Sequence, residues 1–116
     1  IEPTPGPEVL TGSTRLKAGT AQKMILNMIS TGSMVGIGKA YQNLMVDVQQ
    51  TNNKLVVRAQ NITMAATGCT RDEAAAALHE ANGSAKVAIV MLLTKVSAKE
   101  AQNQLDAAQG HVRDTL

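Results

Sequence analysis

The chain has 116 residues, a net charge of +2 and a single aromatic residue, Tyr41. This length suits one domain with a largely aliphatic core. The weak charge and the lack of rings exclude a typical nucleic-acid surface. The lone Cys69 and the separated His79 and His111 form no disulfide pair or zinc pattern, and the longest apolar run, 87–93, is too short to span a bilayer. We expect no metal, cofactor, nucleic-acid partner or membrane span, and a cytoplasmic location.

The first seven residues exclude a helix, because Pro3, Pro5 and Pro7 fix the backbone and remove amide donors. The chain also starts at Ile1 rather than at Met. We interpret this segment as the end of a strand cut from its sheet, in a truncated domain. A disordered tail is the alternative.

The next segment has the apolar spacing of one helix face, and we predict a helix over 14–31. Ser13 or Thr14 would cap its start and Gly32 would end it. The apolar residues that set the spacing are Ala21, Met24, Ile25, Met28 and Ile29.

The middle of the chain is less regular. Residues 34–42 contain two glycines and predict a short helix or a turn, whereas 43–48 fits either a strand-like connector or a helix. Thr51 and Asn52 are caps for a further helix that ends at Gly68.

The last third predicts three short helices and a final turn over 111–116. Two capping boxes begin helices here, Thr70 with Glu73 and Ser97 with Glu100. Between them, the apolar segment 84–94 must be buried on most sides. Gly83 and Gly110 are the stops. The predicted fold class is mainly all-α.

The stretch 6–23, GPEVLTGSTRLKAGTAQK, carries the chemistry. Free amides at a loop-to-helix junction attract a phosphate or another anion. Arg15 and Lys17 near a helix start require a negative partner, because the helix dipole disfavours cations there. That partner could be a ligand or Glu8, and the residues alone leave both readings open.

The segments GPEVLTGSTRLKAGTAQKMILN and YQNLMVDVQQTNNKL resemble the C-terminal part of the N-acetylmuramic acid 6-phosphate etherases, a family related to the glucokinase regulatory proteins. The resemblance implies three regions. Residues 1–32 would end a doubly wound α/β sugar-isomerase domain, with a strand over 1–3; residues 33–69 would form a connector and helix; and residues 70–116 would form a small helical bundle.

The implied activity is a lyase reaction that removes the lactyl ether, giving N-acetylglucosamine 6-phosphate and D-lactate, without a metal, during peptidoglycan recycling. The implied protein is a cytoplasmic homodimer. By the resemblance, Glu8 contacts sugar hydroxyls, while the hydroxyls and cations of the helix start frame the substrate pocket. Those pocket residues are Ser13, Thr14, Arg15 and Lys17. The catalytic glutamates and the main phosphate-binding serines would lie upstream, so we expect none in this chain and no activity from it alone.

Two residues depart from the family pattern: Gln42 stands where glycine is usual, and Gly36 where a basic residue is usual. The bundle over 70–116 is similar to ubiquitin-associated three-helix domains. A non-enzymatic phosphosugar-binding regulatory protein and a helical protein-interaction module are the alternative functions. The connector residues could form turns or approach the active site, and we favour the turns. They are Asn43, Asp47 and Asn52.

Overall fold

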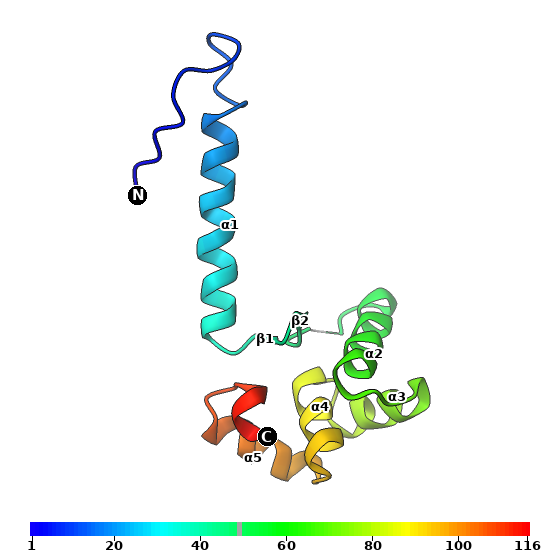
Figure 1. Cartoon of the computed structure of the whole chain (residues 1–116). Helices are drawn as coiled ribbons and strands as arrows, with labels where there is room; N and C mark the ends of the chain where they lie inside the picture. The colour runs from blue at the N-terminus through cyan, green and yellow to red at the C-terminus, as the bar shows by residue number, and fades with distance from the viewer. Residues whose placement is uncertain (49) are drawn as a thin grey trace. The chain divides into compact units, whose positions relative to one another are not determined.

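The computed structural model describes residues 1–48 and 50–116, which form two compact units, Ile1–Met34 and Val35–Leu116. Within the described residues there are five α-helices, one short hairpin and a terminal 3₁₀ turn (Figure 1). The elements are α1 (Ala18–Gly36), β1 (Ala40–Tyr41), β2 (Leu44–Met45), α2 (Asn53–Thr67), α3 (Arg71–Glu80), α4 (Ala85–Thr94), α5 (Ala98–Ala107) and η1 (Val112–Thr115). None of the helices in this described part combines the length and apolar character needed to cross a membrane.

The first unit contains most of α1, and its bounds correct the predicted helix at both ends. The helix begins at Ala18 rather than near residue 14, so neither Ser13 nor Thr14 is its cap. It also passes through Gly32, which lacks a positive φ, and ends at Gly36. A glycine inside a helix lowers stability by only about 1 kcal/mol relative to alanine, so it need not end the helix.

The chain leaves α1 through Gly38 and enters a hairpin. Ala40 pairs with Met45 and Tyr41 with Leu44 in antiparallel register. The strand alternative for 43–48 is therefore correct over Leu44 and Met45. Gln42 begins the two-residue turn with φ of 54°, a backbone conformation that residues other than glycine rarely adopt.

The second unit confirms the predicted helix starts and the end of α2, whereas α3 and α5 end at Glu80 and Ala107, three residues before the predicted stops Gly83 and Gly110. The Asn52 side chain accepts the Leu55 amide at the start of α2, and Gly68 ends that helix with φ of 74°. Thr70 and Glu73 form a complete capping box on α3. At α5 the recorded bond is the one from the Glu100 amide to the Ser97 hydroxyl, which is half of the predicted box.

The core of the second unit surrounds α4, which packs against α2, α3, α5 and η1 (Figure 1). Ile89 and Val90 are fully buried in α4, and Val46 of the connector joins the same cluster. The apolar pattern of 84–94 thus correctly predicted burial on most sides. The connector and the helices share one core.

A close backbone contact fixes the hairpin segment against the C-terminal turn of the second unit. A Cβ atom on Gly38 would lie 2.7 Å from the Gly110 carbonyl oxygen, and Gly38 has φ of +74°. A Cβ atom on Gly110 would lie 3.2 Å from Lys86 Nζ. Gly38 is therefore required by space as well as by conformation, whereas Gly110 is favoured by its φ of +81°, because the Lys86 side chain can move aside.

Candidate functional site

The loop before α1 is organised by the carboxylate of Glu8. Glu8 Oε2 accepts the Lys17 amide at 2.8 Å, and Oε1 accepts the Ala18 amide at 3.0 Å. These two amides are at the N-terminal end of α1, where the helix dipole favours negative charge. Glu8 therefore caps α1 from ten residues earlier in the chain.

The backbone of the other predicted site residues completes this loop. The Ser13 carbonyl accepts the Leu16 amide at 3.2 Å, and the Thr14 carbonyl accepts the Gly19 amide at 2.8 Å. The side chains of Ser13 and Lys17 are half-buried, whereas those of Thr14 and Arg15 are exposed. The structure thus brings all five predicted residues into one short loop.

Glu8 binds the start of α1 itself, and among the described residues it has no recorded ion pair with Arg15 or Lys17, so the negative partner of these two cations stays open. The Glu8 carboxylate binds backbone amides, and the ion pair recorded among the described residues is elsewhere, between Lys39 Nζ and Asp47 at 3.0 Å. A phosphate could not use the Lys17 and Ala18 amides while Glu8 holds them. The hydroxyls and the two cations of the loop are the groups that remain for a ligand.

The three connector residues have roles of different kinds. Asn52 caps α2, and Asp47 pairs with Lys39. Asn43 lies in the hairpin turn between Tyr41 and Leu44. Asn52 therefore has the kind of role that the sequence favoured, in which an Asx side chain holds a turn or helix start.

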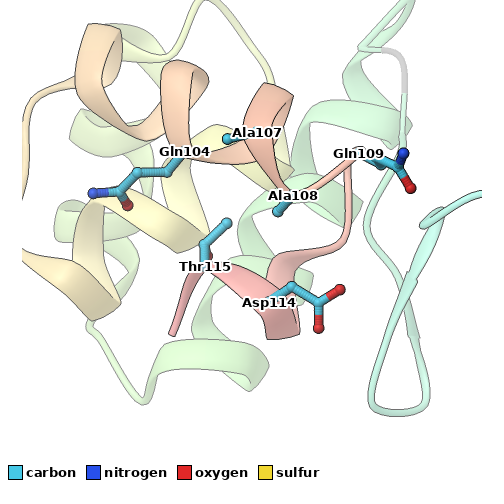
Figure 2. A pocket seen from close by; sticks show the side chains of 6 residues that line it. All are labelled: Gln104, Ala107, Ala108, Gln109, Asp114 and Thr115. Carbon is cyan, nitrogen blue, oxygen red and sulfur yellow. The ribbon is translucent and has the colours of Figure 1, made fainter.

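The second unit carries a pocket that sequence reasoning missed. It has a volume of about 560 Å³ and lies between the C-terminal end of α5 and η1 (Figure 2). Gln104, Ala107 and Thr115 are among its lining residues. Gln104 Oε1 is buried and has no hydrogen-bond partner among the described residues. No motif in the sequence indicated this pocket, because η1 forms it by folding back onto α5.

Two further hollows meet at the joint between α3 and α4. One, of about 460 Å³, includes Val56 and His79, and the other, of about 370 Å³, includes Asp47 and Ser84. They share Gln50, Asn82 and Gly83. In residues 1–48 and 50–116, no group of three or more His, Cys, Asp or Glu side chains could hold a metal ion.

Comparison with known proteins decides the family. The chain is 63% identical over all 116 residues to the N-acetylmuramic acid 6-phosphate etherase of Shouchella clausii. It is 61% identical over 113 residues, 97% of its length, to the protein of that name from Cutibacterium acnes, and 57% identical over its full length to the one from Pasteurella multocida. The chain belongs to the N-acetylmuramic acid 6-phosphate etherase family.

The match places this chain in the C-terminal part of the etherases. It covers 39%, 37% and 38% of the lengths of the three relatives named above, so it spans about two fifths of each. These identities confirm over the whole sequence the resemblance seen in the GPE and YQNLMVDV segments. No family model matches the chain.

Proposed function

We propose that this chain is the C-terminal portion of an etherase that cleaves the D-lactyl ether of N-acetylmuramic acid 6-phosphate. The products are N-acetylglucosamine 6-phosphate and D-lactate, and the role is amino-sugar recycling in the cytoplasm. The observation that carries this proposal is the 53–63% identity to proteins of that name across the chain. The catalytic glutamates belong to the part of the etherases outside this chain.

The loop around Glu8 is the proposed contribution of this chain to the substrate site. An ionised carboxylate has about four lone-pair positions, of which the two backbone amides occupy two. The remaining positions of Glu8 accept sugar hydroxyls, so one carboxylate fixes the loop and contacts the substrate. Ser13 and Thr14 offer hydroxyls, and Arg15 and Lys17 offer positive charge to the anionic sugar.

The first test compares this chain with the complete protein. We expect lactate release from the substrate by the complete etherase and none by residues 1–116 alone. Turnover by the isolated chain would contradict the proposed position of catalysis. Substrate binding without turnover by the complete protein would favour the non-enzymatic regulatory alternative instead.

The second test addresses the loop in the complete protein. We expect Glu8→Ala and Arg15→Ala each to lower kcat/KM by 10-fold or more, about 1.4 kcal/mol or more, because each removes a charged hydrogen-bonding group. Glu2→Ala, which removes an exposed carboxylate from the same unit, is the matched control. Unchanged kinetics in both loop variants, with helical content retained, would eliminate the proposed site.

The assembly proposed for the complete protein is a homodimer of sugar-isomerase domains, each followed by a helical bundle of the ubiquitin-associated type. The supporting observation is α1, which has no buried residue in this chain. Met24, Met28 and Ile29 are exposed by 53%, 64% and 53%. Apolar residues at helical spacing normally face a packing partner. Light scattering of the complete protein should give the mass of two subunits, and a monomer mass would contradict the proposal.

A further inference from the structure

The joint between α3 and α4 contains the single asparagine-glycine pair of the sequence, Asn82 and Gly83. Asn82 is exposed and has φ of 50°, and Gly83 has φ of 83°. This pair is the asparagine context most prone to deamidation, because glycine has no side chain to hinder attack by its own amide nitrogen. Exposure of Asn82 gives water access to the product of that attack.

Two hydrogen bonds restrain Gly83, the residue whose nitrogen would attack. The Gly83 amide donates to the Leu78 carbonyl at 2.8 Å, which ties the attacking nitrogen to the end of α3. The Gln50 side chain donates to the Gly83 carbonyl at 2.8 Å, which holds the same residue from the connector. The Gly83 nitrogen can reach the Asn82 side chain only after this joint opens locally.

We propose that Asn82 is a site of spontaneous deamidation in the folded chain, gated by opening of the two hydrogen bonds on Gly83. The deprotonated Gly83 nitrogen attacks Cγ of Asn82, a C–N bond forms, and ammonia leaves with the proton from that nitrogen. The resulting succinimide ring is then opened by one water molecule. Opening at either carbonyl gives aspartate or isoaspartate at position 82, and no oxidant or further reactant is needed.

Either product changes the joint. A new carboxylate stands two residues before Ser84, the N-cap of α4, in the lining that the two hollows share. Negative charge at position 82 is favoured by the nearby start of α4 but disfavoured by the end of α3, which lies directly before it. Isoaspartate lengthens the backbone by one carbon atom and displaces the Gly83 carbonyl from Gln50. The modification therefore loosens the link between the connector and the helices.

The experiment follows conversion at Asn82 by peptide mass spectrometry of the purified chain during incubation at mildly alkaline pH. Asn103 is the internal control, because it is also exposed but lies inside α5 and precedes Gln104. We expect conversion at Asn82 and none at Asn103 in the folded chain. We also expect faster conversion at Asn82 when the chain is unfolded in urea.

The gating step is tested with Gln50→Ala, which removes the bond to the Gly83 carbonyl. The expected result is conversion about fivefold faster, the factor that corresponds to one net hydrogen bond. Gln102→Ala is the matched control, since Gln102 donates to Asp106 on the surface of α5, away from this joint, and its rate should equal that of the unchanged chain. Circular dichroism verifies that both variants are folded.

Each outcome decides the inference. If Asn82 converts no faster than Asn103 in the folded chain, Asn82 is not a modification site. If the folded and unfolded chains convert at the same rate, or if Gln50→Ala has no effect on the rate, the hydrogen bonds on Gly83 do not gate the reaction.

Discussion

Each of the two units of this chain is stabilised internally by a different kind of interaction. The first, Ile1–Met34, has a long helix without a buried residue, and its loop is held by the hydrogen bonds of one carboxylate. The second, Val35–Leu116, encloses a core centred on Ile89. A helix gains most of its stability from packing of its apolar face. The comparison shows that hydrogen bonds from Glu8 to the helix start organise the first unit, whereas burial of apolar side chains stabilises the second.

The sharpest test of this comparison removes the same side chain from each unit. Ile89 is 0% exposed, so Ile89→Ala should lower the free energy of unfolding by about 2–5 kcal/mol. Ile29 is 53% exposed, so Ile29→Ala should change it by less than about 0.5 kcal/mol. Urea unfolding followed by circular dichroism measures both. Equal losses would show that α1 is as well packed as α4.

A second pair of substitutions tests the close backbone contact of the second unit. Gly38→Ala places a Cβ atom 2.7 Å from the Gly110 carbonyl oxygen and strains a positive φ, so it should lower stability by about 1–3 kcal/mol. Gly36→Ala meets no atom within 4 Å at the end of α1 and should be neutral or stabilising. Thermal melting of the two variants distinguishes them. A neutral Gly38→Ala would mean that the hairpin segment shifts freely.

The hairpin turn offers a smaller, stabilising change. Gln42 has φ of 54°, so Gln42→Gly should raise the free energy of unfolding by up to about 1 kcal/mol by removing the left-handed strain. Asn43→Gly is the control, because Asn43 has no positive φ and should gain nothing. If Gln42→Gly destabilises the chain in urea, the Gln42 side chain makes a contribution larger than its strain.

The smallest effect concerns pH and the glutamate in the capping box of α3, in the second unit. The Thr70 amide and then the Thr70 hydroxyl, both bonded to Glu73, lower the pKa of Glu73 below its ordinary value of 4.5. A lowered pKa in the folded state adds stability above 4.5 that is lost as the pH falls through the folded value. Glu73→Gln should therefore reduce the fall in melting temperature on acidification. An unchanged fall would locate the acid sensitivity at other carboxylates.

Much of the second unit could be predicted from the sequence. Asn52 and the Thr70–Glu73 pair fixed the starts of α2 and α3, and Gly68 fixed the end of α2. The first unit was predicted less well, because the residues that resemble caps, Ser13 and Thr14, precede a turn instead of the helix. The five candidate site residues were placed in one loop by sequence, while their contacts were not.

By itself, the sequence determined the family, the mainly helical character and most helix starts, since caps, glycines and apolar spacing act over three or four residues. Only the tertiary structure decided that Glu8 caps α1, that Gly38 packs on Gly110, and that Gln50 holds Gly83. These contacts join residues that are nine or more positions apart, and each depends on where the backbone returns. The spacing of residues in the sequence does not predict such long-range contacts.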